Sequence, residues 1–257
     1  MKISVCLITL NEERNLPRCL ASVAPIADEI VIVDSGSRDR TAEIAQQFNA
    51  RFIHQDWLGN THQKNFAQDQ ASHPWVFNID ADEELCPELI RAINKLKTDQ
   101  ASDSSDAPDG YRVSRMVFYL GKWIRHGDWY PDYLVRLYRR DKARFSGGDV
   151  HGQVKVHGTA QLLPGHLHHF TYTDAADRSA RCAKYASSWA KTAHQEGRRC
   201  NALAPFLHAA VRFSKGYILK HGFCDGKIGW EIAMGNAHEV WLKYHLLYQL
   251  NHASSEK

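Results

Sequence analysis

The first hundred residues alternate between two hydrophobic periodicities, and this alternation restricts the fold more than any other feature of the chain. Apolar, β-branched runs such as residues 30–33 predict buried strands, and the stretches between them place apolar residues at helical spacing. Strands that alternate with helices form a largely parallel sheet with helices on both faces. Ligands bind beyond the carboxyl ends of the strands in such a sheet. The sequence therefore predicts an α/β fold with a site at that edge.

The expected elements follow in chain order. Strands are expected at residues 3–10, 29–34, 50–54 and 75–79, and helices at residues 14–23, 38–48, 60–71 and from residue 87 onward. A polar loop at residues 100–110 precedes strand-forming sequence up to residue 170, and the last ninety residues are mainly helical. Thr9, Asp34 and Asp80 come at the ends of predicted parallel strands. We therefore expect these three side chains at one edge of the sheet.

Composition narrows the class of protein. Residues 1–100 contain ten Lys or Arg and fifteen Asp or Glu, whereas residues 111–160 contain ten and four. This asymmetry is consistent with a cleft that holds a metal ion and an anionic substrate, with solvated surface charge as the alternative. The six cysteines form no CxxC pair, which favours a reduced, cytoplasmic compartment. No run approaches the ~18 apolar residues of a membrane span.

Two carboxylates one residue apart, Asp80 and Asp82, follow the apolar run at residues 75–79. Carboxylates at positions i and i+2 of an extended chain point to the same side. At a strand end they can bind a divalent cation whose open positions accept a diphosphate. Such a cation neutralises charge on a leaving nucleoside diphosphate. A solvated turn is the alternative for the pair taken alone.

Asp34 ends another predicted strand and precedes Ser35-Gly36-Ser37. A carboxylate in this position can accept hydrogen bonds from the base or ribose of a nucleotide. A helix N-cap at Ser37 or Asp39 is the alternative, and capping is compatible with binding. The chain has neither a GxGxxG nor a GxxxxGK[ST] motif, so dinucleotide-binding and P-loop sites are not indicated.

Several motifs in one order resemble glycosyltransferase family 2, which has the GT-A fold. They are residues 5–13 (VCLITLNEE), residues 30–41 (IVIVDSGSRDRT) and residues 79–83 (IDADE). Residues 56–59, residues 63–65, Trp75, residues 136–140 and the final helices resemble the branch containing the lipopolysaccharide inner-core β-1,4-glucosyltransferases. The resemblance implies a GT-A domain at residues 1–170, a Rossmann-like, mostly parallel sheet with helices on both faces, and a helical C-terminal region at residues 171–257.

The resemblance also implies an activity. It is a metal-dependent inverting transfer of a hexose, glucose in this branch, from a UDP-sugar to a heptose of the lipopolysaccharide core, with Mg²⁺ or Mn²⁺ as the cofactor. The alternatives are a family 2 enzyme for another polysaccharide or protein acceptor, and a non-catalytic nucleotide-sugar-binding module. Nucleic acid is not an expected partner, because no RNA- or DNA-binding motif accompanies the basic residues 111–160.

Residue roles carried over by motif complete the expected site. The nucleotide pocket would be lined by Thr9, Asn11, Glu12, Asp34 and Asp39, and the diphosphate or sugar by Gln63, Lys64 and Asn65. Asp80 and Asp82 would bind the ribose and the metal ion, with Asp82 the more direct ligand. Relatives often add a histidine ligand, and among His166, His168 and His169 the last, just before Phe170, fits best.

The catalytic base is where the chain departs from the branch. Relatives carry His-Glu where this chain has His151-Gly152. An inverting transfer needs a base that takes the proton of the acceptor hydroxyl. Asp149 and His151 are equal candidates, with Asp132 behind them, and an impaired enzyme is the alternative.

The C-terminal helices combine basic and aromatic residues, as in Arg212, Phe213, Lys215, Tyr217, Lys220 and Lys227. Such helices suit the headgroup region of an anionic membrane. A lipid-linked acceptor and a peripheral location on the cytoplasmic face of the inner membrane are therefore expected, with helices packed only on the catalytic domain as the alternative.

Overall fold

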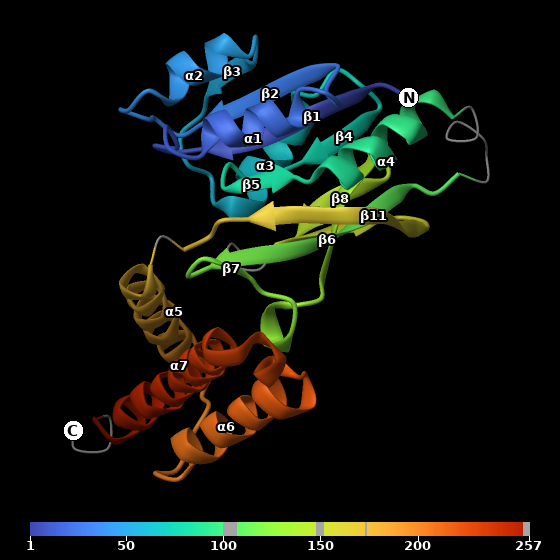
Figure 1. Ribbon diagram of the computed structural model, residues 1–257. Helices are drawn as coiled ribbons and strands as arrows, with labels where there is room; N and C mark the ends of the chain where they lie inside the picture. Colours follow the sequence, from blue (N-terminus) through green and yellow to red (C-terminus); the bar gives the residue numbers. More distant parts are fainter. Residues whose placement is uncertain (100–106, 148–151, 173, 254–257) are drawn as a thin grey trace. The chain divides into compact units, whose positions relative to one another are not determined.

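The protein was analysed as a computed structural model that describes residues 1–99, 107–147, 152–172 and 174–253. The chain divides into two compact units (Figure 1). Unit 1 comprises Met1–Arg115 and Asp132–His169, and unit 2 comprises Met116–Pro131 and Phe170–Lys257. The second unit thus contains a segment from the middle of the chain, residues 116–131, in addition to the helical C-terminal region.

Unit 1 is built on a mixed sheet whose strands run in the order β3-β2-β1-β4-β8-β6-β11-β5. Its strands are β1 (Ile3–Thr9), β2 (Glu29–Asp34), β3 (Arg51–His54), β4 (Trp75–Asn78), β5 (Glu83–Leu85), β6 (Gly110–Tyr119), β8 (Asp132–Arg139) and β11 (Ala160–His169). The last four residues of β6 belong to unit 2. The predicted α/β class is confirmed. The four strands from β3 to β4 are parallel, whereas β8 is antiparallel to β4 and to β6. The expectation of a mostly parallel sheet thus holds for the first four strands, whereas the pairings β4–β8, β8–β6 and β11–β5 are antiparallel.

Helices cover both faces of the parallel strands (Figure 1). They are α1 (Leu16–Val23), α2 (Thr41–Gln47), α3 (Asn60–Asp69) and α4 (Pro87–Thr98). One core cluster joins α1, α2 and α4 to side chains such as Phe77, which is fully buried. The other joins Ala67 of α3 to Val76, the next side chain along β4 from Phe77. Successive side chains of a strand point to opposite faces, so each strand contributes to both clusters.

The helix expected after Ser37 begins later than predicted, because α2 starts at Thr41. The backbone of the intervening loop is bound by two carboxylates, Asp34 and Asp39, and therefore cannot enter the helix earlier.

A short hairpin of β9 (Ala143–Ser146) and β10 (Gln153–Val156) adds to the α3 side of the sheet. Part of the predicted polar loop, residues 100–106, lies outside the described residues.

Unit 2 consists of short elements from residues 116–131 and a helical C-terminal part. Its elements are β7 (Lys122–Trp123), η2 (Gly127–Trp129), α5 (Ala175–Gln195), α6 (Ala204–Phe213), the π-helix η3 (Ser214–Leu219), η4 (Gly222–Asp225) and α7 (Gly226–Ala253). Buried Arg178 connects them: its guanidinium lies 4.8 Å from the Trp129 ring and donates to the Ile232 carbonyl oxygen at 3.0 Å. None of the described helices combines the length and the apolar character needed to cross a bilayer.

Candidate functional site

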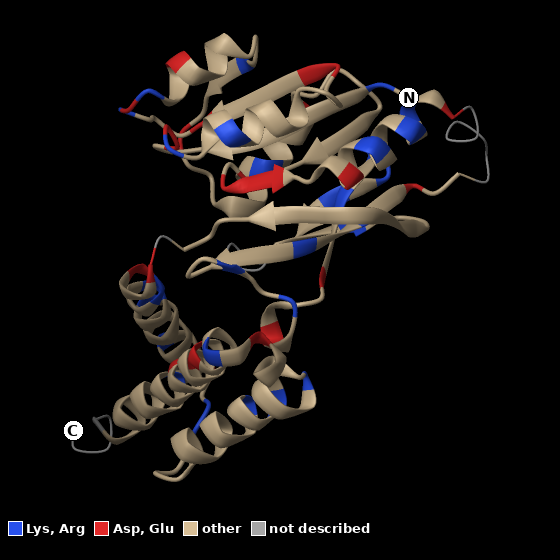
Figure 2. Ribbon diagram, in the orientation of Figure 1, with Lys and Arg blue, Asp and Glu red and all other residues tan. Residues whose placement is uncertain are grey.

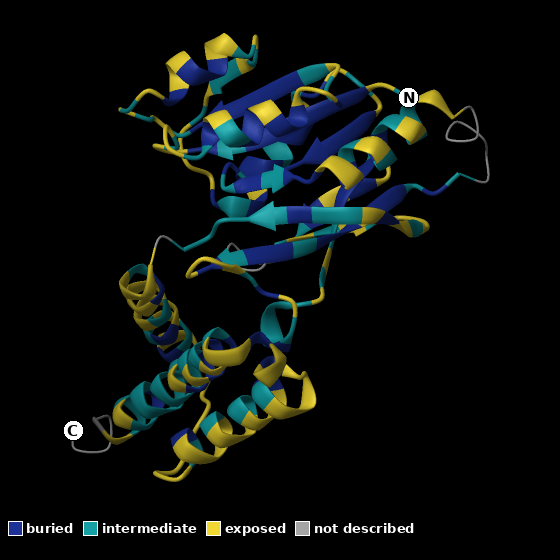
Figure 3. Ribbon diagram, viewed as in Figure 1, coloured by how far each residue is buried: buried dark blue, intermediate teal, exposed yellow. Residues whose placement is uncertain are grey.

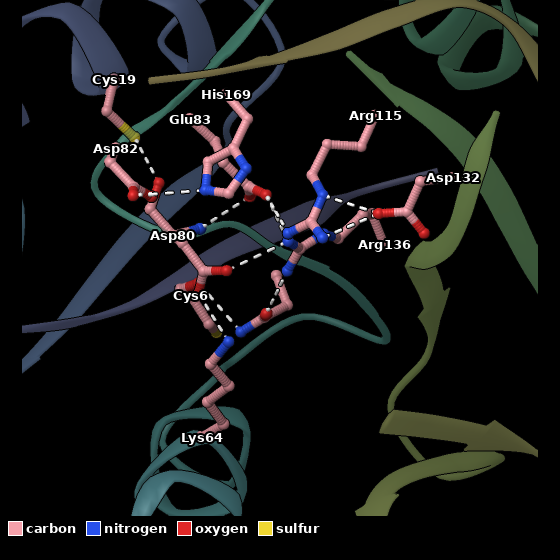
Figure 4. Close-up of polar contacts among 11 residues, drawn as sticks. Cys6, Cys19, Lys64, Asp80, Asp82, Glu83, Arg115, Asp132, Arg136 and His169 are labelled. Atoms are coloured by element: carbon pink, nitrogen blue, oxygen red, sulfur yellow. Dashed lines mark hydrogen bonds and ion pairs between the residues drawn. The ribbon is translucent and has the colours of Figure 1, made fainter. Parts of the chain in front are cut away.

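Asp80 lies at the centre of a cluster of charges just beyond the end of β4 (Figure 4). Lys64 of α3 approaches one carboxylate oxygen, with Nζ 2.5 Å from Oδ1, and Arg136 of β8 donates to the other, with Nη2 3.1 Å from Oδ2. Although burial raises the pKa of a carboxyl group, the charges of Lys64 and Arg136 hold the pKa of Asp80 well below its usual range. The Asp80 carboxylate is therefore ionised, and each of its two oxygens contacts a cationic side chain.

Glu83 binds both Arg136 and the backbone of Asp80. Its side chain is fully buried, and Arg136 Nη2 lies 2.5 Å from Glu83 Oε1, while Arg136 Nη1 donates to Asn78 Oδ1 at 3.0 Å. The second oxygen of Glu83 accepts the backbone N–H of Asp80 at 3.0 Å. A buried carboxylate is tolerated only when it is paired in this way. Glu83 and Arg136 therefore fix the turn that carries both aspartates.

Glu83 and Arg136 lie within the motifs at residues 79–83 and 136–140, but the sequence did not predict a role for either. The local sequence does not mark Glu83, because its neighbours are Asp82 and Glu84. Only the structure shows that Glu83 is fully buried, which requires a cation nearby. The sequence does not indicate which of several arginines supplies that cation. Strand β8 decides it, because Arg136 lies on the strand next to β4.

Asp82 is paired with His169. Strand β5 is antiparallel to β11 with Glu83 opposite His169, which brings the imidazole Nε2 to 3.3 Å from Asp82 Oδ2. His168 is the neighbour of His169 on β11 and so points to the opposite face of the strand. Burial lowers the pKa of His168, whose charge is further opposed by His166. Of the three candidate histidines, the structure places His169 beside Asp82.

The pair has features of a partial metal site. Asp82 supplies an oxygen donor and His169 a nitrogen donor, and Nδ1 of His169 is buried without a hydrogen-bond partner in the described part of the chain. Within the described residues, no three His, Cys, Asp or Glu side chains are gathered as ligands. Asp82 and His169 can therefore hold a divalent cation only together with oxygens from water or a substrate. Asp80 is poorly suited as a third ligand, because its oxygens are bound by Lys64 and Arg136.

Asp34 organises the loop that follows β2. Its carboxylate accepts Thr9 Oγ1 at 2.8 Å, the backbone N–H groups of Gly36 and Ser37 at 2.8 and 2.7 Å, and the Ser37 hydroxyl. Gly36 has a φ of +96°, a conformation that favours glycine. Asp34 is only 3% exposed. It therefore shapes the loop and has little surface left for contact with a ligand.

The loops after β1 and β2 are bound to each other. Asn11 accepts the backbone N–H of Arg38 at 2.9 Å, and Glu12 donates its N–H to Thr41 Oγ1 at 2.9 Å. Asp39 accepts the Glu13 N–H and the Thr41 hydroxyl. Although burial opposes it, these hydrogen bonds lower the pKa of Asp39, with that from the Thr41 hydroxyl the largest. Of the five predicted nucleotide-pocket residues, Thr9 and Asp34 thus end β1 and β2, and Asn11, Glu12 and Asp39 lie on the two joined loops that follow.

Gln63, Lys64 and Asn65, which were predicted to lie near the diphosphate or sugar, each contact a different part of the structure. Gln63 is fully buried and donates to Ser35 Oγ and to the Gln55 carbonyl oxygen, at 3.1 and 3.0 Å. Asn65 exchanges two hydrogen bonds with the backbone of Phe145 in β9. Lys64 is the member of the triplet that reaches the carboxylates of the Asp80 cluster. Gln63 and Asn65 hold the loop and the hairpin on either side of it.

Asp132 begins β8 and is paired with Arg115 of β6. Its Oδ2 accepts Arg115 Nη2 at 2.7 Å and Nε at 3.0 Å, and the same guanidinium lies 3.6 Å from Glu83. One oxygen of the Asp132 carboxylate is thus bound by the Arg115 guanidinium. The two other predicted bases, Asp149 and His151, lie outside the described residues.

Comparisons with known proteins agree on one family. Residues 4–155 match the family model described as Glycosyl transferase family 2. The lipopolysaccharide core biosynthesis glycosyltransferase LpsC of Rhizobium meliloti is 32% identical, over 97% of this chain and 93% of its own. An uncharacterized glycosyltransferase of Rickettsia typhi is 30% identical, over 88% of this chain and 79% of its own.

A solved structure, that of S. aureus TarS 1-349 in complex with UDP-GlcNAc, resembles the fold. The alignment covers 100% of this chain and 92% of that one, with 15% identity and a TM-score of 0.50. At this identity the likeness concerns the fold alone.

Proposed function

Because the chain belongs to glycosyl transferase family 2, we propose that it transfers a hexose, with glucose as the first candidate, from a UDP-sugar to a heptose of the lipopolysaccharide core with inversion at the anomeric carbon. Glycosyl transfer follows from the family, and the similarity to LpsC supports a lipopolysaccharide core acceptor. The observation that supports a metal-dependent transfer from a nucleoside diphosphate sugar is the pairing of Asp82 with His169 beside the Lys64–Asp80–Arg136 cluster.

The charges of this cluster suit a diphosphate. The ammonium of Lys64 has three N–H donors, of which Asp80 takes one at 2.5 Å, and within the described residues the other two remain for phosphate oxygens. We propose Mg²⁺ or Mn²⁺ as the cofactor, held by Asp82 and His169, which would neutralise the charge that develops on the leaving UDP. Asp80 then acts by orienting Lys64, because its own two oxygens are occupied.

The joined loops after β1 and β2 are the proposed nucleoside site. Asn11 is exposed, and Glu12 and Asp39 are half-buried, so these three can contact a ligand. Thr9 and Asp34 lie beneath them and hold the backbone of Gly36 and Ser37 in place. This division of roles makes Asp34 a positioning residue for the nucleoside.

The base is proposed to be Asp149 or His151. Asp132 remains the third candidate, and its contacts with Arg115 favour a structural role, because one of its oxygens already accepts two hydrogen bonds. The acceptor hydroxyl must attack the anomeric carbon from the face opposite the leaving diphosphate. A lipopolysaccharide acceptor is embedded in a membrane, so the enzyme would work at a membrane surface, proposed to be the cytoplasmic face of the inner membrane.

A panel of UDP-sugars with purified, core-truncated lipopolysaccharide that ends in heptose tests the proposal. We expect a product with one donor, UDP-glucose, and a β linkage by NMR, as inversion of an α-linked donor requires. Asp82→Asn should abolish transfer, because a neutral amide is a poor ligand for a hard cation. Asp141→Asn is the matched control, since Asp141 is exposed and follows the end of β8 that pairs with the start of β4, whereas Asp82 follows the end of β4.

Three outcomes would contradict parts of the proposal. Undiminished transfer in EDTA would exclude the metal ion. An α-linked product would exclude inversion. Binding of UDP-sugars without turnover on any acceptor would identify the chain as a binding module.

A further inference from the structure

Unit 2 carries an apolar surface that its own fold leaves uncovered. We define the α6 surface as the exposed apolar side chains of α6, its preceding residue and η3. They are Leu203, Phe206, Leu207, Val211, Ile218 and Leu219, each more than half exposed. Figure 3 shows exposed residues on every turn of α6, beside intermediate and buried ones. Contiguous exposed apolar surface of this kind is typical of a binding face.

The spacing places these residues on one side of α6. Leu203, Phe206, Leu207 and Val211 stand at positions i, i+3, i+4 and i+8, which lie along one stripe of a helix. The other side of the helix packs on α7, where the His208 ring stacks on Tyr244 with centroids 3.9 Å apart. Helix α6 is therefore attached by one side and presents a continuous apolar stripe on the other.

The surroundings of the stripe are positively charged. Residues 197–224 contain five Lys or Arg and no Asp or Glu, and Figure 2 shows α6 without any red. The next acidic residue, Asp225, is buried and bound by the backbone N–H groups of Arg125 and His126. Arg212 and Lys220 share the single buried carboxylate of Asp128, each at 3.3 Å, and both remain partly exposed. The segment therefore keeps a net positive charge next to exposed apolar side chains.

Aromatic rings extend the surface onto α7. Phe206 lies 6.3 Å from the Trp241 ring, which in turn stacks with His245 at 4.6 Å. Tryptophan and histidine rings have an apolar body and a polar edge, which suits the boundary between water and lipid.

We propose that the α6 surface docks on an anionic lipid bilayer, with the apolar stripe inserted between the headgroups and Lys215 and Lys227 contacting the phosphates. Charge complementarity favours this occupant over a second copy of the chain. A two-fold interface would bring two copies of residues 197–224 together, and this segment contains five Lys or Arg and no Asp or Glu. A helix with an apolar side and basic flanks is the form that lies in a membrane interface. The proposal deepens the proposed function by assigning its membrane contact to the α6 surface, and its test does not depend on the transfer activity.

Flotation of the full chain with vesicles tests the proposal. We expect binding to vesicles of phosphatidylcholine with phosphatidylglycerol, and at least tenfold weaker binding to phosphatidylcholine alone. The double variant Leu207→Gln, Val211→Gln should lower binding to the anionic vesicles at least tenfold, because it removes apolar side chains without adding charge. Leu162→Gln is the matched control: Leu162 is 51% exposed, lies in unit 1, and should leave binding unchanged.

A second variant examines the charges separately. Lys215→Gln with Lys227→Gln should weaken binding to anionic vesicles several-fold and leave binding to neutral ones unchanged. Lys220 is excluded from this variant because it contacts buried Asp128. Circular dichroism and sugar transfer to a soluble acceptor report whether each variant is folded, so loss of vesicle binding and loss of transfer can be told apart.

Two results would overturn the proposal. The first is wild-type chain that does not float with anionic vesicles, or that floats equally well after the Leu207 and Val211 changes. The second is a dimer in sedimentation velocity that the same two changes dissociate, which would assign the α6 surface to a second copy.

Discussion

Replacing Glu83 with glutamine should destabilise unit 1 far more than the same change at the next residue. Glu83 and Glu84 are neighbours on β5 and point to opposite faces of the strand. The Glu83 side chain is fully buried against Arg136, whereas the Glu84 side chain is 32% exposed and lies 3.7 Å from Arg18. The pair of variants therefore compares one chemical change in two environments.

The loss of unfolding free energy in each variant depends on whether the arginine that loses its carboxylate partner is buried. Removing one partner of a buried ion pair costs roughly 3–5 kcal/mol, because the other charge stays buried. Arg136 keeps Asp80 at 3.1 Å, so we place the loss for Glu83→Gln at the lower end, about 3 kcal/mol. An exposed ion pair contributes about 0–1 kcal/mol, and Glu84→Gln should cost no more than that.

Urea unfolding followed by circular dichroism measures both values. The comparison is valid where the two variants and the wild-type chain have the same dependence of unfolding free energy on urea concentration. Equal losses for the two variants, or a loss below about 1 kcal/mol for Glu83→Gln, would refute the reasoning that a buried Glu83–Arg136 pair supports the turn.

Three further predictions concern the site. Because the folded-state pKa of Asp80 is lowered, its charge stabilises the fold at neutral pH, and the difference in unfolding free energy between wild type and Asp80→Asn should shrink as the pH falls below about 4; a difference that does not change with pH would contradict this. Asp34→Ala should weaken UDP binding by about 1–3 kcal/mol through the loop that it holds, as measured by calorimetry, and unchanged affinity would move the nucleoside site elsewhere. One of Asp149→Asn and His151→Ala, but not both equally, should lower kcat roughly 10²–10⁴-fold with donor affinity preserved, and nearly full kcat in both would direct the search to Asp132.

The order of elements in unit 1 could be predicted from the sequence because it depends on local patterns. Each parallel strand is an apolar run, and each helix between them has an apolar stripe, so periodicity alone identifies them. The positions of Thr9, Asp34 and Asp80 at strand ends follow from the same pattern, because parallel strands place their carboxyl ends at one edge. The resemblance to family 2 could likewise be found in the sequence, because its motifs are short continuous segments.

The partners of these residues are decided by tertiary structure. Arg136 reaches Asp80 and Glu83 only because β8 lies antiparallel beside β4, and His169 reaches Asp82 only because β5 pairs with the end of β11. Strand β5 has three residues and no periodicity that could predict it. Likewise, the apolar side of α6 is evident as a stripe in the sequence, but a stripe also forms when a helix is buried. Only the packing of the opposite side on α7 shows that this one remains exposed. Local patterns determine which elements form, whereas pairing between distant segments depends on the whole fold, because the free energy of a contact is gained only when both sides are in place.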